Sequence, residues 1–94
     1  MSNHKRQVSG NVQHRVEVLT DMAFDQIRDF STPCHLKRAG ECLREAYTLL
    51  MKPSSIRSPL YGAARNIYNL RAETIDSAIQ MLGGMPERGY RVNV

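Results

Sequence analysis

The chain has 94 residues, a formal net charge of +4, two cysteines, no tryptophan and 41% hydrophobic residues. A chain of this length forms one domain around one modest core, which excludes two-domain enzymes, Rossmann folds and TIM barrels. Its apolar runs are all shorter than the roughly 18–20 residues that a membrane-spanning helix needs. Residues 1–8 are polar and have no apolar stretch behind them, so we expect a disordered N-terminal tail and no signal peptide.

Apolar residues in the first third of the chain recur at the spacing of one helix face, with steps of 4, 3, 4, 4 and 3 residues. This spacing predicts an amphipathic helix, and Ser9 or Asn11 is placed to cap its start by accepting a backbone N–H. Three carboxylates follow one another at intervals of four on another face. The apolar set is Val12, Val16, Leu19, Ala23, Ile27 and Phe30, and the acidic set is Asp21, Asp25 and Asp29.

A second helix is predicted from Pro33 to about Lys52, because Thr32 is a good N-cap residue and proline is favoured at the first helical position. The link between the two helices is only a residue or two. An antiparallel helical hairpin from Asn11 to Lys52 is therefore the expected arrangement. The apolar seam of the second helix consists of Leu36, Ala39, Leu43, Ala46 and Leu50.

A third helical region is predicted from Pro59 to Leu82, after a connection that begins at Pro53. Ser58 followed by proline repeats the capping pattern of the second helix. The dipeptide Gly83-Gly84 is typical of a helix C-terminus. We expect an irregular tail over residues 85–94.

The apolar stripe of this third region is interrupted, because the step from Leu70 to Ile75 is five residues. Either one helix bends near residues 69–73 or two shorter helices meet there. The sequence thus predicts an all-α fold over residues 9–84. It consists of an antiparallel helical hairpin and a third, possibly broken helix, which makes a single small domain of three or four helices.

Motifs typical of catalysis or cofactor binding are absent from the sequence, which has no G-x-S-x-G, P-loop or G-x-G-x-x-G pattern. A structural zinc site needs four ligands at short spacings, and no Cys-x-x-Cys pair occurs. On one helix, Cys34 and Cys42 would lie about 12 Å apart along the axis, which is too far for a disulfide. We therefore predict a non-enzymatic protein with free thiols, no cofactor and no metal, in the reducing cytoplasm.

Charge is unevenly distributed, with a sum of −2 over residues 11–30 and of +3 over residues 31–60. An acidic element beside a basic one suits self-association or a charged protein partner at least as well as nucleic acid. Tyr and Met, which are enriched in interface cores, support a protein partner and a homo-oligomer. The candidate partner-binding residues are Asp21, Asp25, Asp29, Tyr47, Tyr61 and Tyr68.

The alternative function is that of a small basic helical protein that binds DNA and regulates transcription. Its phosphate contacts would come from arginines near the second and third helices. Glutamates interrupt the basic residues of the second helix, which favours a solvated face over a DNA-recognition helix. The candidate nucleic-acid residues are Arg38, Arg44, Arg57 and Arg65.

The segments Ser9–Leu19 (SGNVQHRVEVL) and Ser58–Ala64 (SPLYGAA), together with the size of the chain, resemble small accessory proteins of enterobacterial phages and satellite elements. The greatest similarity is to the derepression (epsilon-type) antirepressors of satellite phages. This resemblance implies a regulator in the cytoplasm of a bacterial host cell that binds a phage repressor and releases its lytic genes. No binding residue is carried over from the family to a position of this chain.

Overall fold

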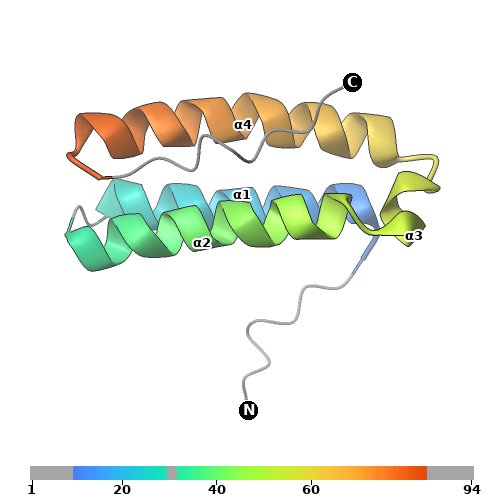
Figure 1. The fold of residues 1–94 in the computed structure, drawn as a ribbon, viewed down its shortest axis with the longest axis horizontal. Helices are drawn as coiled ribbons and strands as arrows, with labels where there is room; N and C mark the ends of the chain where they lie inside the picture. Colours follow the sequence, from blue (N-terminus) through green and yellow to red (C-terminus); the bar gives the residue numbers. More distant parts are fainter. Residues whose placement is uncertain (1–9, 30–31, 85–94) are drawn as a thin grey trace, which may run out of the picture.

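The computed structural model describes residues 10–29 and 32–84, which form four helices and no strand. Figure 1 shows the three long helices side by side, with α2 antiparallel to both α1 and α4, and with the short α3 at one end of the bundle. The predicted all-α fold and its helical hairpin are confirmed. The helices are α1 (Val12–Asp29), α2 (Pro33–Leu50), α3 (Pro53–Ile56) and α4 (Tyr61–Met81).

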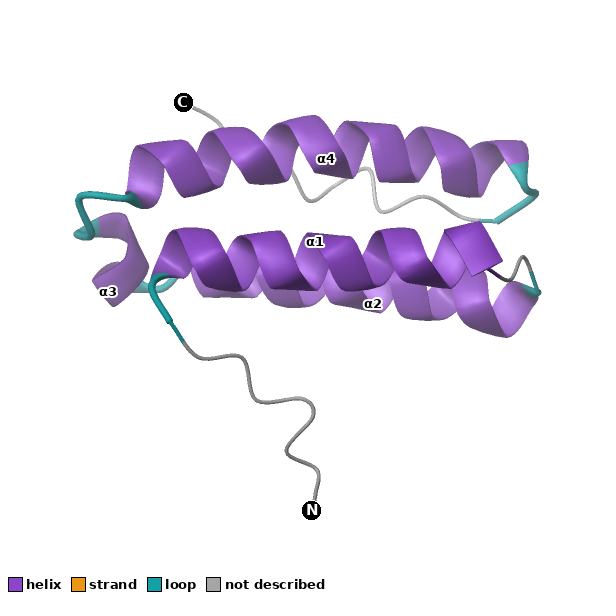
Figure 2. Cartoon of the chain, turned by 180° about the vertical axis from the view of Figure 1, so that it is seen from behind, coloured by secondary structure: helices purple, strands orange, loops and turns teal. Residues whose placement is uncertain are grey.

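The predicted tails, residues 1–8 and 85–94, lie outside the described residues, as do Ser9 and Phe30. Within the described part, α1 packs against both α2 and α4 and supplies one wall of the core (Figure 2). Buried aliphatic and alanine side chains from all three long helices fill the space between them. Burial of this apolar surface is the main term that stabilises the bundle.

Local capping determines where the first two helices begin. The side chain of Asn11 accepts a hydrogen bond from the backbone N–H of His14 at 2.8 Å, so Asn11 caps α1. Thr32 is the N-cap of α2, because its hydroxyl accepts from the backbone N–H of His35, and Pro33 occupies the first helical position. The predicted start of α2 is confirmed.

The end of α4 follows the predicted glycine signal. Gly83 has a φ of +91°, in the left-handed region that glycine adopts without steric cost. Its N–H donates to the carbonyl of Gln80 at 3.0 Å, and the N–H of Gly84 donates to the carbonyl of Ile79 at 2.8 Å. These two bonds satisfy carbonyls that the end of the helix leaves unpaired.

The connection after α2 contains a helical turn that is not predicted from the sequence. α2 ends at Leu50, and Pro53 begins the one-turn helix α3. Proline fits there because Lys52 is the N-cap, and the carbonyl of Lys52 accepts from the backbone N–H groups of Ser55 and Ile56 at 3.0 Å. The proline therefore ends one helix and starts the next.

The start of α4 lies two residues later than predicted, at Tyr61 instead of Pro59. The Ser58 hydroxyl accepts from the backbone N–H of Leu60 at 3.1 Å, and the Ser58 carbonyl accepts from the N–H of Tyr61 at 3.0 Å. Ser58 thus closes a turn before the helix and does not cap the helix itself.

α4 is one unbroken helix, which decides between the two arrangements that its interrupted stripe allows. Its buried seam consists of two alanines, a tyrosine and two isoleucines in steps of 4, 4, 3 and 4 residues. Leu70 does not belong to this seam, because 70% of its surface is exposed. The five-residue step to Ile75 is therefore not a break in the helix. The seam consists of Ala64, Tyr68, Ala72, Ile75 and Ile79.

Candidate functional site

The acidic residues predicted to bind a partner lie on α1, where arginines accompany them. Asp21 and Asp25 are exposed, and the side chain of Asp29 lies outside the described part. Arg71 of α4 is 3.0 Å from the Asp21 carboxylate, and Arg28 is 2.6 Å from the Asp25 carboxylate. This face of α1 is therefore less negative than its sequence predicts.

Arg71 also links α4 to the backbone of α1. Its Nη1 donates to the Thr20 hydroxyl at 2.9 Å and to the Glu17 carbonyl at 3.3 Å, besides its bond to Asp21. Thr20 is fully buried and donates to the Val16 carbonyl at 2.8 Å. This link is not predicted from the sequence, in which its one signal is Thr20, a threonine beside the apolar seam of α1.

A shallow depression lies between α1 and α4 beside these carboxylates. Its apolar part comes from Phe24 and Ile27, which are half-buried. The side chains of Asp21 and Asp25 are 65% and 55% exposed, so each carboxylate stays accessible although it is paired. The depression is lined by Asp21, Phe24, Asp25, Ile27, Arg28 and Ala78.

The three candidate tyrosines do not form one surface. Tyr68 is fully buried in the core, so the prediction that it contacts a partner is wrong. Its ring packs against that of half-buried Tyr47, with ring centroids 6.3 Å apart. Tyr61 is half-buried at the start of α4, where the Arg65 guanidinium lies 5.8 Å from its ring centroid. The sequence position of Tyr68 coincides with the apolar seam, which explains its burial.

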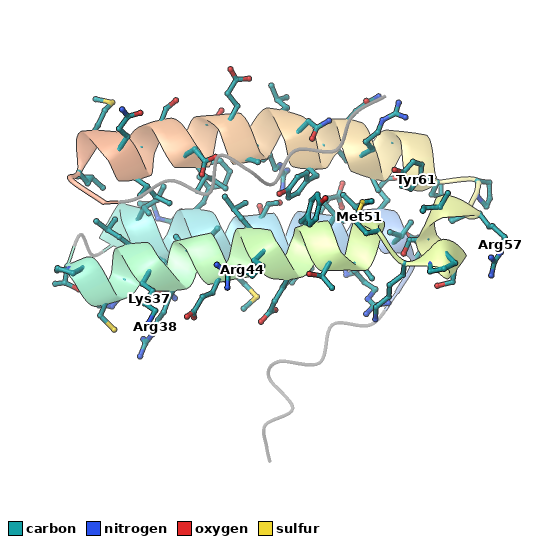
Figure 3. All side chains as sticks on the ribbon, viewed as in Figure 1. Lys37, Arg38, Arg44, Met51, Arg57 and Tyr61 are labelled. Atoms are coloured by element: carbon teal, nitrogen blue, oxygen red, sulfur yellow. The ribbon has the colours of Figure 1, made fainter. Side chains whose placement is uncertain are left out.

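The four candidate nucleic-acid arginines are dispersed over three elements. Arg38 and Arg44 are exposed on α2, where six residues correspond to about 9 Å and about 120° around the helix. Arg57 follows α3 at the far end of the bundle from Arg38 (Figure 3), and Arg65 is half-buried beside the Tyr61 ring. These arginines therefore do not share one face.

The large apolar side chains with the greatest exposure lie on α4. Leu70 is 70% exposed and Met81 is 86% exposed, and their separation of eleven residues places them on one helix face about 16 Å apart. Thr74 and Ser77 lie between them and are exposed and uncharged. We call these four residues the α4 outer stripe.

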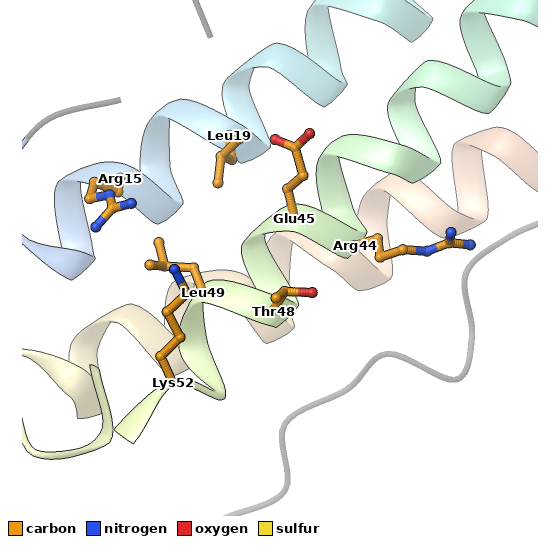
Figure 4. A pocket seen from close by; sticks show the side chains of 7 residues that line it. All are labelled: Arg15, Leu19, Arg44, Glu45, Thr48, Leu49 and Lys52. Carbon is orange, nitrogen blue, oxygen red and sulfur yellow. The ribbon is translucent and has the colours of Figure 1, made fainter. Parts of the chain in front are cut away.

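A groove of about 290 Å³ runs between α1 and α2 (Figure 4). It combines three basic side chains with a carboxylate and two buried leucines. In the sequence, Arg15 and Lys52 contribute only to the charges of their segments, because their proximity depends on how the hairpin helices align. The lining residues are Arg15, Leu19, Arg44, Glu45, Thr48, Leu49 and Lys52.

Within residues 10–29 and 32–84, no group of three or more His, Cys, Asp or Glu side chains is arranged to hold a metal ion. None of the helices in this part of the chain has both the length and the apolar character of a membrane span. Cys34 is exposed, Cys42 is buried and both are free thiols. Comparison with protein families, with curated proteins and with solved structures found no match to this chain.

Proposed function

We propose that this protein is a non-enzymatic regulator that acts by binding another protein. The proposed partner is a transcriptional repressor, which the protein inactivates as an antirepressor in the cytoplasm of a bacterial cell. The observation that carries the proposal is the α4 outer stripe. Its two large apolar side chains, Leu70 and Met81, are the most exposed in the described part of the chain, and their burial by a partner would favour association. The resemblance to derepression proteins supports a repressor as the partner.

The α1–α4 depression borders this surface, because Ala78 in the depression lies four residues after Thr74 and three before Met81, and residues at these spacings are neighbours on a helix surface. Its apolar part accepts an apolar side chain, and Asp21 and Asp25 accept basic ones. A repressor presents basic residues where it contacts DNA, so such a surface is complementary to it. A protein that binds only the DNA-free repressor lowers operator occupancy by its differential affinity, without catalysis.

The predicted homo-oligomer forms part of the same proposal. An uncharged stripe accepts a second copy in antiparallel orientation without like-charge repulsion. Light scattering at high micromolar concentration measures this property, and a strict monomer contradicts it.

Fluorescence anisotropy of labelled operators tests the antirepressor function with a panel of purified phage repressors. We expect the protein to release the operator from one repressor and not to bind the free operator. The variant Leu70→Ser/Met81→Ser should weaken release by about tenfold, because it removes the two large apolar side chains that the partner would bury, and each tenfold change corresponds to about 1.4 kcal/mol. The control Met51→Ser/Ile56→Ser removes apolar side chains that are 45% and 48% exposed elsewhere, and should release operator normally.

Random duplex DNA at low and moderate salt tests the alternative DNA-binding function. The dispersed arginines give this function less support than the stripe gives to protein binding. Tight duplex binding with a steep salt dependence, together with no effect on any repressor, would contradict the antirepressor proposal.

A further inference from the structure

Two basic side chains face each other across the groove between α1 and α2. Arg15 lies near the start of α1 and Lys52 directly follows α2, so the antiparallel hairpin brings them to the same end of the bundle. Figure 4 shows Lys52 extending toward Arg15 past Leu49, whereas Arg44 points away from α1. Because like charges repel, an anion placed between Arg15 and Lys52 interacts favourably with both.

Neither of these two side chains has a partner among residues 10–29 and 32–84. The Arg15 Nε atom is buried and donates no hydrogen bond. Lys52 forms no ion pair there, in contrast to Arg28 and Arg71, which each contact an aspartate. The Arg15 side chain as a whole is only half-buried, and a guanidinium without an acceptor in the described residues forms charge-assisted hydrogen bonds with a ligand that supplies a carboxylate.

We propose that this groove binds an acidic segment of a protein partner, with carboxylates on Arg15 and Lys52. The apolar floor, from Leu19 and Leu49, suits a protein segment that carries apolar side chains between its carboxylates. Glu45 lines the same groove and repels the continuous row of phosphates of a nucleic acid. A protein segment avoids this repulsion by placing an uncharged residue opposite Glu45.

The site is independent of the proposed antirepressor surface, since it shares no residue with the α4 outer stripe or the α1–α4 depression. A partner that binds here is therefore additional to the repressor, or binds through a second segment of it. The variant Leu70→Ser/Met81→Ser separates the two surfaces, because it should bind an acidic ligand as the wild type does.

The probe is a fluorescein-labelled synthetic helical peptide of Glu and Leu with its carboxylates on one face, and the matched peptide has Gln in place of Glu. Binding is measured by anisotropy with the full chain. Arg15→Gln/Lys52→Gln should raise the Kd of the acidic peptide about tenfold, since each exposed ion pair changes Kd by roughly two- to fivefold. Lys37→Gln/Arg38→Gln is the matched control, with the same change of charge at exposed positions of α2, and should change Kd by less than about twofold.

Three results would overturn the proposal: no binding of the acidic peptide at high micromolar concentration, equal losses for the groove and control variants, or equal binding of the Gln peptide. Tighter binding of random duplex than of peptide, lost in the groove variant, would also overturn it and assign the groove to phosphates. Amide NMR shifts of the wild type do not depend on the stability of any variant. The acidic peptide should shift Leu19 and Leu49, and unchanged signals there would refute the site.

Discussion

Replacing Arg71 by methionine tests the link between α4 and α1. Arg71 Nη1 donates to Thr20 Oγ1 at 2.9 Å, to Asp21 Oδ1 at 3.0 Å and to the Glu17 carbonyl at 3.3 Å. Methionine keeps much of the aliphatic length of the arginine side chain but donates no hydrogen bond. The substitution therefore measures the contribution of the guanidinium with little change in apolar packing.

The expected loss in the free energy of unfolding follows from the burial of the three acceptors. The pair with Asp21 contributes less than about 1 kcal/mol, because 65% of the Asp21 side chain is exposed. The bond to Thr20 contributes more, since that residue is fully buried and a charged donor strengthens the bond. Thr20 still donates to the Val16 carbonyl after the substitution, which limits the loss. We expect Arg71→Met to lower the free energy of unfolding by about 2 kcal/mol.

Urea unfolding followed by far-ultraviolet circular dichroism measures this change. In a double-mutant cycle, Arg71→Met and Thr20→Val should show a coupling of about 1 kcal/mol. Arg28→Met is the control, because its ion pair with Asp25 is exposed on both sides and should contribute less than about 0.5 kcal/mol. A loss for Arg71→Met no larger than that for Arg28→Met would refute the assigned role of Arg71.

Three further predictions concern single positions. Gly62→Ala should raise the free energy of unfolding by about 0.4–1 kcal/mol, because an added Cβ meets nothing within 4 Å in a helical turn. Gly83→Ala should lower the free energy of unfolding by about 1–2 kcal/mol, because Gly83 has a φ of +91°. Urea unfolding measures both changes, and two changes of the same sign would contradict the backbone argument. Thr32→Ala should cost about 1 kcal/mol through loss of the α2 cap, and Thr32→Ser should restore it, so equal losses in the same assay count against capping. Ellman's reagent should modify exposed Cys34 rapidly and buried Cys42 only on unfolding, and a fast phase that survives Cys34→Ser refutes this difference.

The predictions from sequence succeeded where a structural signal is local. Asn11, Thr32 and Gly83 act through hydrogen bonds to backbone groups within a few residues, and each occurs where the pattern places it. Local signals did not predict the structure of the connection between α2 and α4. Pro53 and Ser58 are compatible with several turns, and packing of the helices decides which one forms.

The structure reverses the predicted places of Tyr68 and Leu70 on α4. The stripe that includes Leu70 requires a step of five residues, whereas the observed seam uses Tyr68 and two alanines and keeps helical spacing throughout. Tyr68 is predicted at a partner surface because tyrosine is enriched in interfaces, and Leu70 is included in the apolar stripe because leucine is apolar. A strict helical period exchanges the two, with Tyr68 in the core and Leu70 on the surface. The exposed Leu70 is one of the two apolar side chains on which the proposed association surface rests.

Contacts between residues of different helices could not be predicted from the sequence, because they depend on how the helices align. The bond from Arg71 to Thr20 joins positions 51 residues apart in the chain. The convergence of Arg15 and Lys52 likewise requires the alignment of α1 with the end of α2. A helical period identifies which residues share a face, but it does not say which residue of the next helix lies opposite.

The distribution of charge shows why segment sums are poor guides to surfaces. The −2 segment that contains α1 lies against Arg71 of α4 and carries Arg28, so its described aspartates are both paired. Among residues 10–29 and 32–84, neither Arg15 nor Lys52 is paired with a carboxylate, and these two residues belong to segments of opposite net charge. The acidic ligand is therefore expected beside the helix with the acidic sequence, because the folded neighbours of a charge decide its partner.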